Sequence, residues 1–171
     1  SPAAKRAFRI DEEKPELRAR YGMHREGQST LFARRLIEAG CRYGTVEFNG
    51  YDTHDRHFIE VRDPLLPRLD RAWSALLDDL NDRGMMDNTL VICAGEFGRT
   101  PRVNGSAGRD HYPGANNICL SGAGTAMGSF GGRTDAKCER PVGQTNTTLD
   151  YAATIFRILG IDDTKEYHAS D

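Results

Sequence analysis

Short apolar runs that alternate with helical stripes are the feature that most constrains the fold of this chain. The runs predict strands near 42–48, 88–94 and 116–120. Apolar side chains recur at helical spacing and predict long helices near 27–39, 59–82 and 147–159. Helices that alternate with short apolar strands are typical of α/β layered proteins with a largely parallel sheet, so we expect a three-layer α/β/α sandwich.

The helix expected over 59–82 has the strongest pattern. Its apolar stripe consists of Leu65, Leu69, Trp73, Leu76, Leu77 and Leu80. Pro64 and Pro67 near its start predict an irregular first turn or a break, because proline lacks the N–H that a helix needs. For the last helix we expect a buried face made of Leu149, Ala152, Ile155, Phe156 and Leu159.

Composition narrows the class of protein. A chain of 171 residues suits a single domain with its own core, which we take to span 1–171. The net charge of −2 favours neither a nucleic-acid partner nor a membrane surface, and no apolar run is long enough to cross a bilayer. The four cysteines show no C-x-x-C spacing, which argues against a zinc knuckle, and Cys93 and Cys119 read as buried small hydrophobes.

Two polar loops, 49–57 and 95–113, follow directly after predicted strands. In open α/β sheets ligands bind beyond the carboxyl ends of the strands, so we expect both loops on one functional edge. Carboxylates mixed with imidazoles suit a divalent metal such as zinc, manganese or calcium. The candidate metal ligands are Asp52, His54, Glu96, Asp110 and His111.

Spacing assigns different roles within these loops. Asp52 and His54 are two residues apart and point to one side of an extended segment. Asp110 and His111 are adjacent and diverge, so one ligates while the other orients a ligand or serves a second centre. Arg99 and Arg109 offer planar guanidinium groups for phosphate or sulfate oxygens and are the candidate substrate-binding residues.

Structural explanations stay open for the same residues. Asp52 and His54 also fit ordinary turn chemistry ahead of a helix that starts near Phe58. His57 fits an exposed residue at the start of that helix. Glu96 also fits a structural ion pair with Arg99 or Arg109.

Three stretches resemble a known family: "GYDTHDRHF", "EFGRTPRVNGSAGRDHYP" and "TTLDYAATIFRILGID". They look like the C-terminal half of a large bacterial family of sulfatase-like proteins of unassigned function, which is similar to the alkaline phosphatase superfamily. The resemblance implies an alkaline-phosphatase-like fold of which this chain is the C-terminal part. It also implies an N-terminal half of the same protein and export to the periplasm or the cell exterior.

The resemblance also implies roles for single residues. Asp52 with either His54 or His57 would ligate one metal, and His111 would complete that centre. Glu96 and Phe97 stand where the superfamily has an Asp-His pair. Phe97 thus replaces the histidine that a two-metal centre would need. The superfamily's nucleophile comes from the N-terminal half, so the catalytic residue is unknown.

Two functions follow from these observations. The first is part of a metal-dependent hydrolase that acts on phosphate or sulfate esters. The second is a catalytically degenerate sulfatase-like module that binds an anionic ligand or a surface glycan. Phe97 favours the second function, and the clustered carboxylates and histidines favour the first.

Overall fold

The computed structural model describes residues 2–166 and 168 and divides into two compact units. The first comprises Ser1–Met86 and Arg102–Asp110, and the second comprises Asp87–Pro101 and His111–Asp171. Each unit is treated separately below, and the single domain expected over 1–171 stays a prediction. Within the described residues, no helix combines the length and the apolar character needed to cross a membrane.

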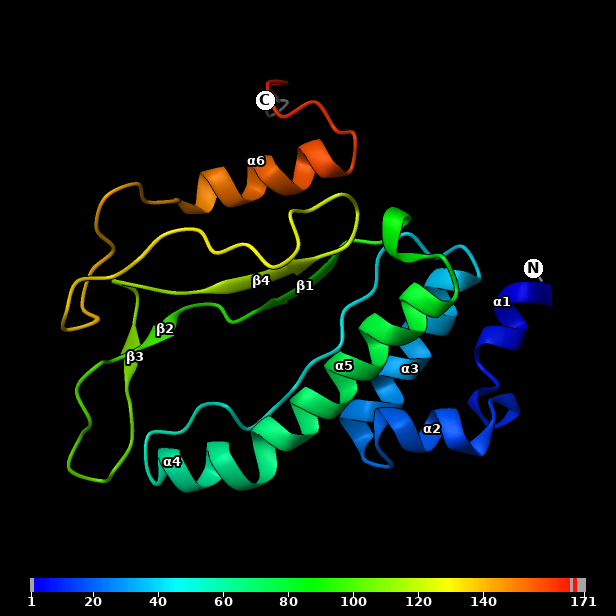
Figure 1. Cartoon of the computed structure of the whole chain (residues 1–171), viewed down its shortest axis with the longest axis horizontal. Coiled ribbons are helices and arrows are strands. Elements are labelled where there is room, and N and C mark those ends of the chain that lie inside the picture. The colour runs from blue at the N-terminus through cyan, green and yellow to red at the C-terminus, as the bar shows by residue number, and fades with distance from the viewer. Residues whose placement is uncertain (1, 167, 169–171) are drawn as a thin grey trace. The chain divides into compact units, whose positions relative to one another are not determined.

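The first unit is helical (Figure 1). Its elements are α1 (Pro2–Ala7), the 3-10 turn η1 (Ile10–Glu12), α2 (Pro15–Tyr21), α3 (Arg25–Glu38), α4 (His57–Glu60), the π-helical turn η2 (Val61–Leu65) and α5 (Leu66–Asp82). Residues 41–56 connect α3 to α4 without any helix or strand. The π-helical turn contains Pro64, which confirms the irregular first turn predicted from the two prolines.

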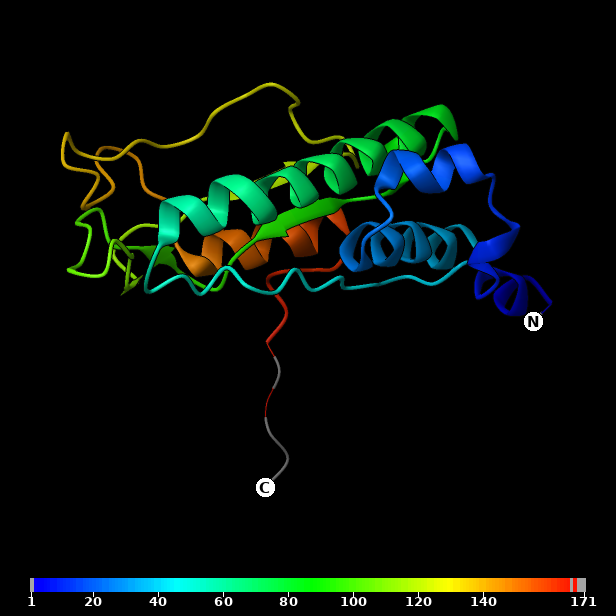
Figure 2. The ribbon, with the colours of Figure 1, turned by 90° about the horizontal axis from the view of Figure 1, so that it is seen from below.

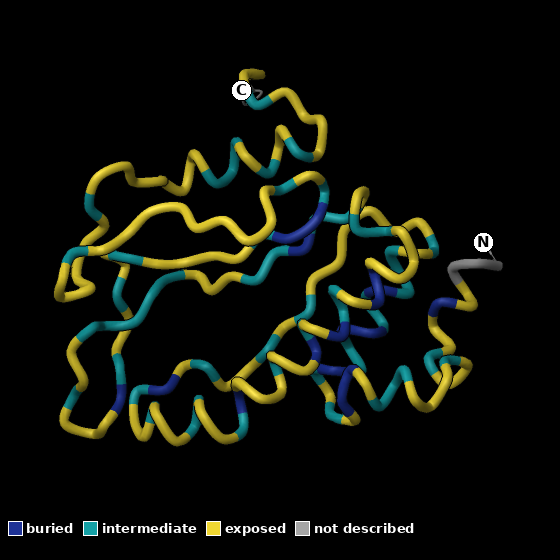
Figure 3. Tube along the Cα trace, viewed as in Figure 1, coloured by how far each residue is buried: buried dark blue, intermediate teal, exposed yellow. Residues whose placement is uncertain are grey.

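The core of the first unit lies where α2, α3 and α5 meet. Figure 2 shows α3 and α5 side by side, as Figure 1 does, and the contacts between the two helices agree. Tyr21 of α2, Leu31 of α3 and Ala75 of α5 are buried together. In Figure 3 the buried positions of this unit gather along these helices. The predicted stripe of α5 is confirmed, since its members are buried or half-buried.

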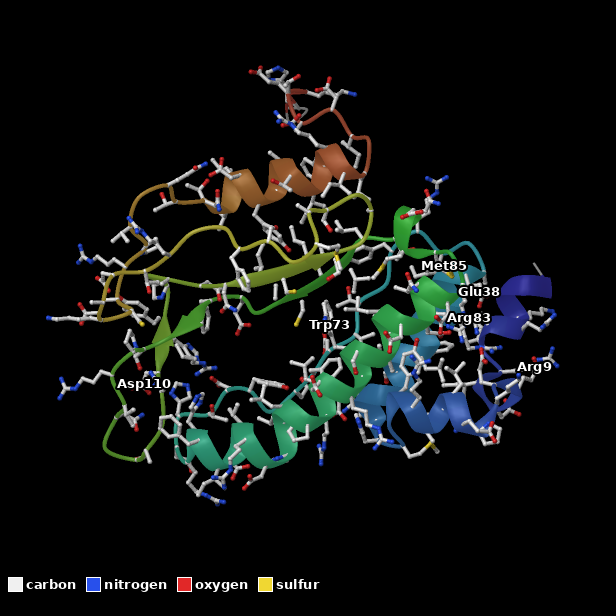
Figure 4. All side chains as sticks on the ribbon, viewed as in Figure 1. Arg9, Glu38, Trp73, Arg83, Met85 and Asp110 are labelled. Carbon is white, nitrogen blue, oxygen red and sulfur yellow. The ribbon has the colours of Figure 1, made fainter. Side chains whose placement is uncertain are left out.

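A buried arginine network joins the same helices. The Arg34 side chain has no exposed surface, and its guanidinium lies 2.7 Å from Glu13 and 2.8 Å from Asp79. Glu38 also contacts Arg34. Its Oε1 forms an ion pair with Arg83 Nη1 at 2.8 Å, and Figure 4 labels both residues. Tyr21 donates its hydroxyl to Asp79 at 2.9 Å. Burial, followed by the charge of Asp79, raises the pKa of Tyr21, so the phenol stays protonated as a donor.

The second unit contains short strands and one helix. Strand β1 (Val91–Ala94) pairs antiparallel with β4 (Ile118–Ser121), and β2 (Gly98–Arg99) pairs antiparallel with β3 (His111–Tyr112). The 3-10 turn η3 (Met86–Asn88) precedes β1, and α6 (Thr148–Ile158) follows the long segment after β4. Thr147 and Asp150 form a capping box that fixes the first residue of α6.

The predicted three-layer α/β/α sandwich with a mostly parallel sheet, alkaline-phosphatase-like in its arrangement, is wrong for the described residues. They form two small antiparallel pairs instead. Strand β4 could lie parallel to β1 only through a crossover connection, usually helical, and residues 95–117 contain no helix. The strand expected at 42–48 is also absent, because these residues have β propensity but find no partner strand.

Two further expectations can be compared with the second unit. The strands expected near 88–94 and 116–120 are present as β1 and β4. The buried face expected for the last helix is wrong in part, because Leu149, Phe156 and Leu159 are exposed. Their spacing is amphipathic, but α6 has no buried residue in the structure.

Glu13 provides a test of the arginine network. Burial raises the pKa of its carboxyl, but hydrogen bonds and charges from Arg34 and Arg35 outweigh burial and lower the pKa overall. A lowered folded-state pKa means stability that is present above the unfolded pKa and lost as pH falls through the folded one. We therefore expect Glu13→Gln to lower the free energy of unfolding at pH 7 by about 1.5–3 kcal/mol.

The difference between wild type and Glu13→Gln should narrow as the pH falls below about 4.3, the ordinary pKa of glutamate, and Glu13 becomes protonated in the wild type. Denaturant unfolding, monitored by circular dichroism at a series of pH values, measures this difference in unfolding free energy. Glu12→Gln is the matched control, because Glu12 pairs with exposed Arg9. This substitution should change the free energy of unfolding by less than about 1 kcal/mol. A constant difference at every pH would contradict the role given to Glu13.

Candidate metal centre

Two loops of the first unit, 51–57 and 104–110, are joined by backbone hydrogen bonds. The N–H of Arg109 donates to the carbonyl of Thr53 at 3.2 Å. The N–H groups of Arg56 and His57 donate to the carbonyls of Ser106 and Ala107, each at 3.0 Å. The polar segment 49–57 and the 104–110 part of the predicted loop 95–113 are therefore in direct contact.

Asn104 organises the second of these loops. Its side-chain oxygen accepts from the N–H groups of Ser106 and Gly108, both at 2.9 Å. Its side-chain N–H₂ donates to the carbonyl of His54 at 2.9 Å and to Asp110 Oδ1 at 3.2 Å. One amide thus fixes the turn, the facing loop and the carboxylate of Asp110.

His54 lies between two carboxylates. Its Nδ1 is 2.7 Å from Asp110 Oδ1, and its Nε2 is 3.0 Å from Asp52 Oδ1. The two nitrogens of one ring thus face two different carboxylates, both belonging to the first unit. Asp110, labelled in Figure 4, sits at the end of the loop that Asn104 shapes.

This geometry separates the roles of the two aspartates. A metal-ligating histidine usually donates its other ring N–H to a carboxylate, which fixes the tautomer and the ring orientation. Asp110 holds Nδ1 in that manner, so Nε2 and the Asp52 carboxylate are the pair that can ligate a shared cation. The sequence predicted that one member of the Asp110-His111 pair would ligate while the other orients a ligand or serves a second centre. That assignment stays a prediction, and the structure shows Asp110 against His54 Nδ1.

His111 follows Asp110 in the sequence but belongs to the second unit. It begins strand β3, and its ring packs against Phe97 with centroids 4.3 Å apart. Phe97 therefore supports an imidazole instead of supplying a ligand. Glu96, also in the second unit, is exposed at the bend after β1.

The remaining candidates have local partners. His57 Nδ1 is 2.6 Å from the hydroxyl of buried Thr53, so of the two histidines it is His54 that contacts Asp52. The Arg109 guanidinium lies over the Phe58 ring, 5.4 Å from its centroid. Arg99 lies opposite His111 in the β2–β3 pair of the second unit.

Two residues of the centre were not foreseen from the sequence. Asn104 precedes a glycine, and Asn-Gly is a strong turn signal that could have marked it. Gly108 is buried, and a Cβ on it would lie 1.8 Å from the carbonyl oxygen of His54. That glycine lets the two loops touch, a requirement that no sequence pattern reveals.

Comparison with known families gives one match. A model of the family described as "Protein of unknown function (DUF1501)" matches residues 1–171. Comparison with curated proteins gives no match. Comparison with solved structures gives no match either.

The close approach at Gly108 can be tested directly. We expect Gly108→Ala to lower the free energy of unfolding by about 1–3 kcal/mol, because its methyl group has no room against the His54 carbonyl. Amide exchange of Arg56, His57 and Arg109 should speed up in the same variant. Gly105→Ala is the matched control, since a Cβ there meets nothing within 4 Å. Equal effects of the two substitutions would contradict the close approach.

Proposed function

The chain belongs to the DUF1501 family over its whole length, and we propose that its loops 51–57 and 104–110 bind a divalent cation. The proposal rests on one observation: the His54 ring lies between the carboxylates of Asp110 and Asp52. With both carboxylates ionised, these three side chains carry net negative charge whether or not the imidazole is protonated. A cation beside Nε2 relieves the repulsion between the two aspartates.

The donor set fits a particular kind of cation. Asp52 and His54 Nε2 would hold the ion directly, and Asp110 would keep the His54 ring in place. The imidazole donor favours zinc and the carboxylate also suits manganese, whereas calcium prefers a set made of oxygen ligands alone. Half-buried His54 and exposed Asp52 leave the centre open to solvent and to a small ligand.

We extend the proposal to catalysis: the chain is part of a metal-dependent hydrolase that acts on phosphate or sulfate esters. A bound divalent ion would polarise an ester oxygen and stabilise charge that develops on it. Arg109, whose guanidinium lies over Phe58, would bind the anionic group of the substrate. Export to the periplasm or the cell exterior stays an expectation of the sulfatase-like resemblance.

A second function is favoured by Phe97. Its ring packs on His111 at the position where the sulfatase-like resemblance places a further metal-binding histidine. A protein with one cation and no second centre suits binding of an anionic ligand or glycan without turnover. Turnover of an aryl phosphate or aryl sulfate by the full-length, metal-loaded protein separates the two functions. Anion binding without turnover would favour the second.

Metal affinity tests the centre itself. We expect metal-free chain to bind about one equivalent of zinc or manganese in calorimetric titration. Asp110→Asn should weaken affinity by about 10–100-fold, as loss of an outer-shell partner does, and Asp52→Asn or His54→Gln should weaken it more. The matched controls are Asp63→Asn and His168→Gln, both at residues with exposed side chains. Unchanged affinity in Asp52→Asn and His54→Gln would remove the proposal.

Anion affinity tests the role of Arg109. Lysine keeps the charge but loses the planar fork, so we expect Arg109→Lys to weaken sulfate or phosphate binding about tenfold in the metal-loaded protein. Its melting temperature should change little. Arg62→Lys is the matched control, because Arg62 is exposed and pairs only locally with Asp63 in the contacts described. Equal anion affinity in wild type and Arg109→Lys would assign Arg109 to structure alone.

A further inference from the structure

Two of the four cysteines face each other across a strand pair. Strand β1 carries Cys93, strand β4 carries Cys119, and the antiparallel register places them directly opposite. Both belong to the second unit, and both are thiols in the structure. They are 26 positions apart in the sequence, so only the strand pairing brings them together.

The register meets the main geometric requirement of a disulfide. Directly opposed residues of an antiparallel pair have Cα atoms about 4.5 Å or 5.5 Å apart, depending on the hydrogen-bonding class. Both separations lie within the range of about 4.4–6.8 Å that disulfides span. Side chains opposite each other also stand on the same face of the pair. Burial, followed by the charge of a neighbouring Cys119 thiolate, raises the pKa of Cys93, which agrees with this proximity.

We propose that Cys93 and Cys119 are a thiol–disulfide exchange site whose oxidised form covalently links β1 to β4. The proposal is independent of the metal centre, which uses neither cysteine. Cys119 is exposed and Cys93 is half-buried, so a soluble disulfide such as oxidised glutathione reaches Cys119 first.

The exchange balances in two steps. The Cys119 thiolate attacks one sulfur of oxidised glutathione, forming a mixed disulfide and releasing one glutathione thiolate. The Cys93 thiolate then attacks the Cys119 sulfur, and the second glutathione leaves. The protein loses two protons and two electrons, and one glutathione disulfide becomes two glutathione thiols.

The link would reinforce a short strand pair. An isolated two-stranded pair is marginally stable in water, and β1–β4 contains four residue pairs. Cys93 also lies two residues before Gly95, whose carbonyl accepts from the Asn116 side chain at 3.1 Å. The disulfide would therefore close the base of the 95–117 segment, next to this existing hydrogen bond.

The other two cysteines supply matched controls. Cys41 belongs to the first unit, Cys138 lies in the turn that follows Asp135, and both are exposed. In neither case does the structure place a cysteine opposite. Exposure alone would oxidise these two at least as readily as Cys93, so selectivity for the 93–119 pair is the distinguishing result.

The test equilibrates the full chain with oxidised and reduced glutathione over a range of ratios. Alkylation, proteolysis and mass spectrometry then map the disulfides. We expect one intramolecular link, Cys93–Cys119, with a mass lower by two hydrogens. The melting temperature of the oxidised chain should rise by at least about 5 °C. Cys41→Ser and Cys138→Ser should keep both results, and Cys93→Ser or Cys119→Ser should lose both.

Peptide mapping of the unaltered chain decides the outcome even if a cysteine variant fails to fold. Links that involve Cys41 or Cys138, or links between two chains, would overturn the proposal. So would reduced Cys93 and Cys119 under strongly oxidising ratios. Retention of zinc by these two thiols, in place of oxidation, would reassign the pair as a metal site and overturn it too.

Discussion

The buried charge of Arg34 is the constraint on which the first unit depends. An arginine whose side chain has no exposed surface is very costly unless carboxylates surround it. Its partners come from different segments: Glu13 precedes α2, Glu38 ends α3, and Asp79 lies in α5. The network thus links the segments that meet in the core, while Leu31 and Ala75 supply the apolar burial.

The arrangement of these helices fixes the backbone that carries the candidate metal centre. Helix α5 continues backwards through η2 and α4 to His57, where the loop bearing Asp52 and His54 ends. One end of that loop is therefore attached to an element fixed by Asp79 of the arginine network. The other support comes from the 104–110 loop, through Asn104 and the close approach of Gly108. A half-exposed histidine can keep one orientation because its flanking backbone is fixed on both sides.

A structural feature could be predicted from the sequence when it depends on neighbouring residues, and could not when it depends on residues far apart in the chain. The α5 stripe and the Pro64 irregularity follow from neighbouring residues, and both were predicted. The direction of β1 against β4 is a distant property, and an apolar run such as Val91–Ala94 carries no information about it. The lack of a helical pattern in 95–117 was the available warning against a parallel crossover.

The same division holds for the centre. Asp52 and His54 were identified because a spacing of two places side chains on one side of an extended segment. The contact of Asp110 with His54 could not be read from the sequence, since residues 54 and 110 are 56 positions apart. The burial of Arg34 could not be predicted from the sequence either. In the sequence it is one charge among many, and only the structure shows it to be buried.

The two units differ in what holds them together. The first has a buried core and a charge network, whereas α6 of the second has no buried residue and leaves Leu149 and Phe156 exposed. Its described strand ladders are short, so the second unit should open at a lower free energy than the first. A covalent link acts mainly by restricting the unfolded chain and does not need a large core. A disulfide between facing cysteines should therefore stabilise the second unit, which has less apolar burial, more than it would stabilise the first.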